Sequence, residues 1–132
     1  MSYPTEKRTK KRQYIIDASV AVKLFSNEQG SEIFRNIFKS SVSGKLSLAT
    51  PDLLIYEVGN ALAIGKKLNA DTVGKALNVL QNSPLQIFPP DNNLIETSAY
   101  FAEKYGITFY DAVYGALALQ LKCPLITSNQ KH

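Results

Sequence analysis

The sequence predicts an α/β fold in which helices cover both faces of a parallel, four-stranded sheet. Four short apolar stretches have the length and composition of buried strands, and longer segments with helical periodicity lie between them. Strands that alternate with helices in this way are typical of a parallel sheet. The chain has 132 residues, 45% of them hydrophobic and 20% charged, which fits one globular domain. The predicted strands are Tyr14–Asp17, Lys45–Ala49, Leu85–Phe88 and Pro124–Thr127.

The helical segments follow from hydrophobic periodicity and from the residues at their ends. Thr50 suits the N-cap and Pro51 the first position of a helix that continues to Lys67. In the segment after it, Val73, Ala76, Leu77 and Leu80 share one stripe of a helix. The predicted helices are Val20–Phe25, Ser31–Ser40, Pro51–Lys67, Asp71–Gln81, Asn92–Tyr105 and Phe109–Leu121.

The net charge of +4 is concentrated at the N-terminus. The chain has 15 Lys and Arg and 11 Asp and Glu; five of the basic residues and one acid lie in residues 1–12, which leaves ten of each sign in residues 13–132. We therefore expect a basic, flexible tail over 1–12 and a single domain over 13–132. Lys10, Lys11 and Arg12 are candidate contacts to the phosphate backbone of a nucleic acid. A solvated, disordered start is the simpler interpretation of the tail.

The composition also bounds where the protein acts. No apolar run approaches the length of a membrane span, and MSYPTEKRTKKR lacks the apolar segment of a secretory signal. Cys123 is the only cysteine, so no intramolecular disulfide can form. These features predict a cytoplasmic protein that does not contact a membrane.

Several catalytic chemistries lack the residues that they need. His132 is the only histidine and the last residue, which argues against Ser-His-Asp or Cys-His catalysis and against a structural zinc site. Gly44 and Lys45 do not complete a phosphate loop, since Leu46 follows them, and no G-x-G-x-x-G motif is present. Oxygen ligands remain, and carboxylates with water favour Mg²⁺ or Mn²⁺.

Three acidic residues stand in apolar surroundings: Asp17 in YIIDAS, Glu57 in PDLLIYEVGNAL and Asp111 in TFYDAVYGALA. Taken alone, Asp17 is most simply the N-cap of the next helix, and Thr108 with Asp111 resembles a capping box. Glu57 lies at the edge of the apolar side of its helix. The helix that begins at Phe109 is almost wholly apolar, which predicts that it is buried on all sides. A carboxylate at its start then needs a cap donor or a metal as partner.

The ends of the first and last predicted strands carry further polar groups. Asp17 closes the first strand, and Thr127, Ser128 and Asn129 close the last. Ligands of open α/β sheets bind outside the carboxyl ends of the strands. If these two strands are neighbours, we expect their polar groups to share one rim of the sheet.

Together these segments resemble the PIN-domain family of ribonucleases and, within it, the VapC-type toxins of toxin–antitoxin modules. The motifs that carry the resemblance are YIIDASVAVKLF, PDLLIYEVGNAL, TFYDAVYGALA and PLITSNQKH, and they occur in the family's order and approximate spacing. The resemblance covers the chain from Tyr14 onward. It implies a PIN-domain-like three-layer fold with a helical hairpin, here at residues 51–83.

The resemblance also implies a metal site and a reaction. Asp17, Glu57 and Asp111 match the family's catalytic acids, which bind Mg²⁺ or Mn²⁺; the cation activates water and stabilises the charge that develops on a phosphodiester. Asn129 stands at a fourth, often acidic position and is the weaker ligand, because an amide offers an oxygen without a charge. Ser19 and Thr127 would orient Asp17 through hydroxyl hydrogen bonds.

The implied partners are an RNA substrate, an antitoxin protein and a second copy in a homodimer. The stripe of Val73, Leu77 and Leu80 is a candidate interface, with ordinary core packing as an equal alternative. Family members commonly continue with a further helix and strand, whereas this sequence stops at His132. We therefore expect an uncovered sheet edge or one that a partner completes.

The function that follows is a metal-dependent endoribonuclease, the toxin of a toxin–antitoxin module. One alternative is a degenerate PIN fold that binds RNA or an antitoxin-like protein without cutting, which Asn129 and the short C-terminus favour. Another is a housekeeping nuclease that processes RNA with the same chemistry.

Overall fold

A sheet of four parallel strands lies at the centre of the structure, as the sequence predicts, and the structure gives its strand order as β3-β2-β1-β4. The structure is a computed structural model and describes residues 11–128. β1 pairs with β2 on one side and with β4 on the other, so that Ile15 lies between Ala49 and Leu125. The strands are β1 (Arg12–Ile16), β2 (Leu46–Pro51), β3 (Gln86–Phe88) and β4 (Leu125–Ile126).

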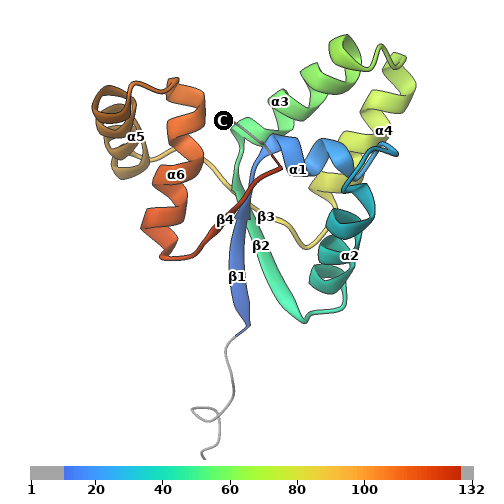
Figure 1. The fold of residues 1–132 in the computed structure, drawn as a ribbon, viewed down its shortest axis with the longest axis horizontal. Helices are drawn as coiled ribbons and strands as arrows, with labels where there is room; N and C mark the ends of the chain where they lie inside the picture. Colours follow the sequence, from blue (N-terminus) through green and yellow to red (C-terminus); the bar gives the residue numbers. More distant parts are fainter. Residues whose placement is uncertain (1–10, 129–132) are drawn as a thin grey trace, which may run out of the picture.

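Helices lie on both sides of this sheet, which gives three layers (Figure 1). The last two helices, α5 and α6, form one outer layer, and the helical elements from α1 to α4 form the other, from which a helical hairpin projects beyond the strands (Figure 1). None of the helices within residues 11–128 combines the length and hydrophobicity needed to cross a bilayer. The helices are α1 (Ala18–Lys23), α2 (Ser31–Val42), α3 (Leu53–Asn60), the π-helix η2 (Ala61–Gly65), α4 (Ala70–Gln81), α5 (Asn92–Tyr105) and α6 (Phe109–Leu121).

The chain reverses its direction across the sheet between β1 and β4. It moves outward from β1 through β2 to β3, then returns through α5 and α6 to form β4 on the opposite side of β1. Such a switch point leaves a crevice at the carboxyl ends of the two strands, because the flanking connections leave in opposite directions. The first and last strands are therefore neighbours, which was the condition for their polar residues to share one rim.

The predicted helix start at Thr50 is wrong. β2 continues through Thr50 and Pro51, which pair with Ile87 and Phe88 of β3, and the helix α3 begins only at Leu53. The Thr50 side chain is buried and donates its hydroxyl hydrogen bond to the Ile16 carbonyl at 2.9 Å, so it ties β2 to β1 instead of capping a helix. The chain stays in the strand here because pairing with β3 satisfies buried backbone N–H and C=O groups. An earlier helix start would leave these groups without hydrogen-bond partners.

The hairpin of α3 and α4 is packed against the core rather than presenting its apolar stripe to solvent. Leu80 is fully buried, and Val73 and Leu77 are half-buried against the core cluster. At Gly59, a Cβ atom would lie 3.3 Å from Leu77 Cδ1, so the missing side chain allows the two helices to approach closely. Of the two interpretations of this stripe, the structure favours core packing over an interface.

Candidate active site

A cavity of about 810 Å³ opens at the carboxyl ends of β1 and β4, between α3 and α6. Its lining includes all three acids that the sequence singles out: Asp17 after β1, Glu57 on α3 and Asp111 on α6. These acids are 40 and 54 residues apart in the chain, and only the fold brings them to one cavity. We call it the carboxylate cavity.

Asp17 is held at the rim by two donors from the start of α1. Its Oδ1 atom accepts a hydrogen bond from the Ser19 hydroxyl at 2.5 Å and from the Val20 amide at 3.2 Å. The second bond makes Asp17 the N-cap of α1 and moves the helix start to Ala18. The capping interpretation of Asp17 is therefore confirmed, and the same side chain also faces the cavity.

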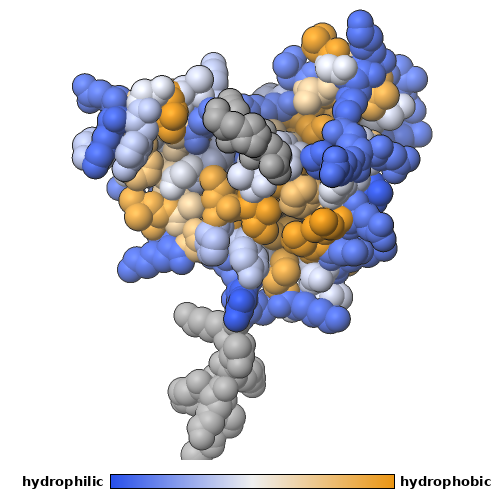
Figure 2. All heavy atoms as spheres, in the orientation of Figure 1, coloured by the Kyte–Doolittle hydropathy of each residue, from blue (hydrophilic) through white to orange (hydrophobic). Residues whose placement is uncertain are grey.

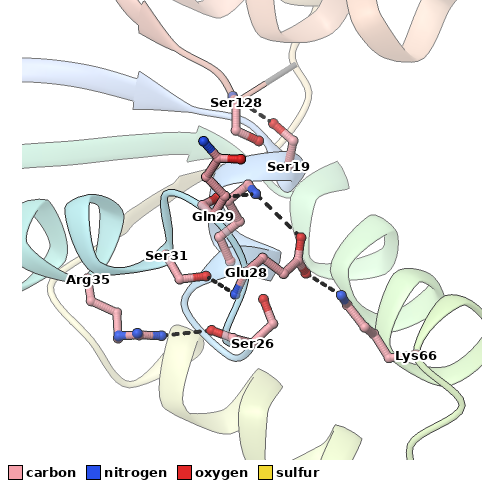
Figure 3. A network of polar contacts seen from close by, with 9 residues as sticks. Ser19, Ser26, Glu28, Gln29, Ser31, Arg35, Lys66 and Ser128 are labelled. Atoms are coloured by element: carbon pink, nitrogen blue, oxygen red, sulfur yellow. Dashed lines mark hydrogen bonds and ion pairs between the residues drawn. The ribbon is translucent and has the colours of Figure 1, made fainter. Parts of the chain in front are cut away.

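Ser19 connects Asp17 to the strand on the other side of the switch point. While it donates to Asp17, its Oγ atom accepts a hydrogen bond from the Ser128 amide at 3.0 Å (Figure 3). The Thr127 hydroxyl lies 3.4 Å from the same atom and also lines the carboxylate cavity. One hydroxyl thus fixes the Asp17 carboxylate relative to the chain that leaves β4, and Thr127 reaches Asp17 through Ser19.

Tyr114 is the residue of this site that the sequence interpretation missed. Its side chain is only 4% exposed, and its hydroxyl donates to Glu57 Oε1 at 2.6 Å. Burial, the bond to Glu57 and the charges of Glu57, Asp17 and Asp111 together hold the pKa of Tyr114 far above its usual value near 10. The phenol therefore stays protonated and remains a donor to Glu57. One signal was available in the sequence: Tyr114 follows Asp111 by three residues and so lies on the same face of the helix.

Asp111 lies in the first turn of α6, where its amide donates to the Thr108 hydroxyl at 3.0 Å. The capping role of Thr108 is confirmed, but the expectation that α6 is buried on all sides is wrong. Leu119 and Tyr110 are each 60% exposed, and Asp111 is itself exposed. The helix packs on the sheet with one side only, so a hydrophobic composition overstated its burial.

The donors of the carboxylate cavity suit a hard cation. Among the described residues of the lining they are carboxylate, hydroxyl and amide oxygens, without a histidine or thiol. Within residues 11–128 no three acidic, histidine or cysteine side chains converge closely enough to enclose an ion on their own. A cation here needs water or substrate oxygens to complete its shell, as Mg²⁺ commonly does.

The remaining predicted site residues are either outside the described residues or away from the carboxylate cavity. Asn129 and Lys10 fall outside the described residues. Lys11 and Arg12 lie at the amino end of β1, at a separate cavity, whereas the three acids lie at the carboxyl ends. A five-residue strand spans about 16 Å, so these two basic residues are distant from the acids. Their predicted contact with RNA stays a prediction.

The chain belongs to the PIN-domain family. The family match covers residues 14–132, so it begins within β1 and includes every later element. Membership agrees with the three-layer architecture and with acids gathered at the carboxyl ends of the strands.

Within this family the chain is similar to a curated ribonuclease and to solved structures of a toxin and of a toxin–antitoxin complex. Over 121 residues, the chain is 31% identical to Ribonuclease VapC1 of Mycobacterium tuberculosis, covering 89% of this chain and 86% of the relative. In fold it is similar to Mycobacterium tuberculosis VapC20, described as a toxin that cleaves the sarcin-ricin loop; the TM-score is 0.72 at 11% identity, covering 89% and 91% of the two chains. It is also similar to a chain of a toxin–antitoxin complex from Klebsiella pneumoniae, with a TM-score of 0.62 at 20% identity, covering 89% and 88%.

Proposed function

We propose that this protein is a divalent-metal-dependent endoribonuclease that serves as the toxin of a toxin–antitoxin pair. The observation that carries the proposal is the carboxylate cavity, where Asp17, Glu57 and Asp111 meet at the switch point of the sheet. The identity with Ribonuclease VapC1 extends over nearly the whole chain and supports the same activity here.

In this proposal Asp17, Glu57 and Asp111 hold Mg²⁺ or Mn²⁺, with Asn129 as a further, weaker ligand. The bound cation supplies charge that lowers the pKa of water and stabilises the developing charge on a phosphodiester. The chain's own contribution is orientation: Ser19 fixes the Asp17 carboxylate, and Tyr114 fixes that of Glu57. Partners of this kind keep ligating oxygens in place and raise metal affinity.

Two exposed tyrosines support single-stranded or looped RNA as the substrate. Tyr56 is 76% exposed and Tyr110 is 60% exposed, and both line the carboxylate cavity from different helices. Exposed aromatic rings stack on unpaired bases, which a duplex keeps stacked inside. We therefore place the unpaired bases that flank the cleaved bond against these rings.

The partners follow from the family and from the surface. A similar fold occurs in a toxin–antitoxin complex, which supports an antitoxin partner for this chain. β4 is an edge strand: it pairs with β1 on one side and, within residues 11–128, with no other strand. A band of hydrophobic residues lies across the face of the molecule seen in Figure 2. A homodimer is also proposed, through a surface other than the packed stripe of α4. The RNA substrate would place the activity in the cytoplasm.

The experiment that tests this function is cleavage of structured and unstructured RNA with Mg²⁺, with Mn²⁺ and with a chelator. Wild type should cleave only with a divalent cation, and Asp17→Asn should lower the rate by at least about 100-fold, because it removes one of three ligand charges. Asp71→Asn is the matched control: Asp71 is exposed on α4 and lies outside the cavity.

Three other results would contradict the proposal. Full cleavage by Asp17→Asn, or cleavage in the chelator, would show that the acids do not act as proposed. RNA binding without any turnover by wild type would favour the binding-module alternative instead. A thermal shift with Mn²⁺ gives an independent readout: wild type should be stabilised and Asp111→Asn should not.

A further inference from the structure

We infer that Lys23 and Lys66 form a subsite for a backbone phosphate of the RNA beside the carboxylate cavity, and that Glu28 occupies this subsite when RNA is absent. The inference rests on the proposed function, since it assigns the next phosphate along the strand that is cut. It names residues that lie outside the carboxylate cavity and come from three separate segments of the chain.

The subsite is a second cavity that continues from the first. It has a volume of about 430 Å³, and its lining includes Lys23, Glu28 and Lys66. Ala18, Ser19 and Ala61 line both cavities, so the two are joined along the start of α1. A strand whose cleaved phosphate lies beside Asp17 would therefore pass these lysines on one side.

The two lysines converge on one carboxylate from different elements. Figure 3 shows Lys66 pointing toward Glu28. Lys23, at the end of α1, lies 3.4 Å from Glu28 Oε1 and donates to the Gln29 carbonyl at 2.8 Å. Lys66, directly after η2, pairs with Glu28 Oε2. Each oxygen of the carboxylate thus has its own ammonium group, an arrangement that anionic oxygens of a phosphate can also satisfy.

The backbone of the loop that carries Glu28 is held by two residues of α2, Ser31 and Arg35. The Glu28 amide donates to the Ser31 hydroxyl at 3.0 Å, and the Ser31 side chain is buried. Arg35 of α2 donates to the Ser26 carbonyl at 2.8 Å at the start of the same loop (Figure 3). The backbone of the loop is therefore fixed, while the Glu28 side chain remains 36% exposed. In this inference a phosphate replaces its carboxylate at the two lysines, and the side chain turns toward solvent.

Charge explains why the site needs these lysines. The lining of the carboxylate cavity contains three acids and no lysine or arginine among the described residues. RNA is a polyanion, and its affinity comes largely from basic groups that replace counterions at the phosphates. The Lys66 hydrogen bond, with smaller contributions from Ser26 and Lys23, lowers the pKa of Glu28 from 4.5 to about 2, so the competing carboxylate is ionised at neutral pH.

The test is binding of a fluorescent single-stranded RNA to the full chain in a chelator, where cleavage does not interfere, at several salt concentrations. Lys66→Met and Lys23→Met should each weaken binding several-fold at low salt. Each should also reduce the magnitude of the slope of the log association constant against the log salt concentration by about 0.7. Glu28→Gln should tighten binding about two- to fivefold, because it removes the internal competitor. Lys66→Arg should retain binding, since it keeps the cation.

An ion pair on α4 supplies the controls. Lys75 and Asp71 lie 3.1 Å apart and are exposed by 76% and 77%, outside both cavities. Lys75→Met and Asp71→Asn change the net charge as the test variants do, and should leave affinity and slope nearly unchanged. Circular dichroism melts check that every variant is folded.

The outcomes separate this inference from the proposed function. If Glu28→Gln binds like Asp71→Asn, or the lysine variants bind like Lys75→Met, the subsite is refuted even where RNA cleavage is found. If the lysine variants lose affinity while wild type never cleaves, the subsite holds and the nuclease proposal fails.

Discussion

The carboxylate cavity and the proposed subsite of Lys23 and Lys66 are adjacent at the same end of the sheet, yet they are organised by different interactions. Two acids of the first, Asp17 and Glu57, are positioned by neutral donors: the Ser19 hydroxyl, the Val20 amide and the buried Tyr114 phenol. The second is an exposed cluster in which Glu28 pairs with two lysines. Neutral donors orient a carboxylate without cancelling its charge, whereas ion pairs neutralise it. In the carboxylate cavity the acids therefore keep a negative charge, which suits a cation. In the proposed subsite the two lysines together carry more charge than Glu28 neutralises, which suits an anion.

The largest effect that would sharpen this contrast is expected from Tyr114→Phe. The change removes the hydroxyl that orients Glu57 while keeping the buried ring. Because partners of ligating carboxylates affect metal affinity by about 10- to 100-fold, the Mg²⁺ concentration for half-maximal cleavage should rise about tenfold. The measurement is a metal titration of the cleavage rate, with the unfolding temperature recorded in parallel.

Tyr100→Phe is the matched control for that change. Tyr100 lies on α5, is 56% exposed and does not line the carboxylate cavity. Loss of its hydroxyl should leave the metal titration unchanged. An equal metal response of wild type and Tyr114→Phe would show that neutral donors do not organise the site.

A smaller effect is expected where the substrate's bases, rather than its phosphates, are held. Tyr56→Leu removes a ring that is 76% exposed at the cavity, and loss of one stacked base costs about 1 kcal/mol or more. Affinity for single-stranded RNA should fall about fivefold, with an unchanged salt slope, because no charge is lost. Tyr105→Leu, 59% exposed on α5, should bind as wild type does. A changed slope in Tyr56→Leu would contradict the separation of stacking from phosphate contacts.

The smallest effect concerns the stability that the Glu28 cluster contributes. The pKa of Glu28 is lowered to about 2 in the folded protein, so the folded state favours the charged form. Its contribution is present above the ordinary value of 4.5 and is lost as the pH falls toward 2. Because the pair is exposed, it should be worth less than about 1 kcal/mol. Urea unfolding of wild type and Glu28→Gln at low salt should differ at pH 7 and converge near pH 2; a difference that persists at pH 2 would assign it to packing.

Local signals in the sequence determined most of the fold. The predicted limits of α5 and α6 agree with the structure, because capping residues and a turn at Gly106 mark where each helix starts or stops. Gly106 has a φ of 63°, a conformation that glycine adopts without strain. The alternation of strands and helices gave the parallel sheet, and Asp17, Glu57 and Asp111 were identified as unusual acids from their apolar neighbours alone.

Tertiary structure decided whatever depends on residues far apart in the chain. Thr50 resembles a helix cap in the sequence. In the structure it lies in β2 between β1 and β3, where it is buried and donates to the Ile16 carbonyl, 34 residues away. The Tyr114 hydroxyl reaches Glu57 across 57 residues, and Lys66 reaches Glu28 across 38. Periodicity and capping rules describe contacts within about one turn, so they find the helices and the acids. The Tyr114 donor to Glu57 and the lysines that pair with Glu28 are set by how the helices and the loop before α2 pack at one end of the sheet.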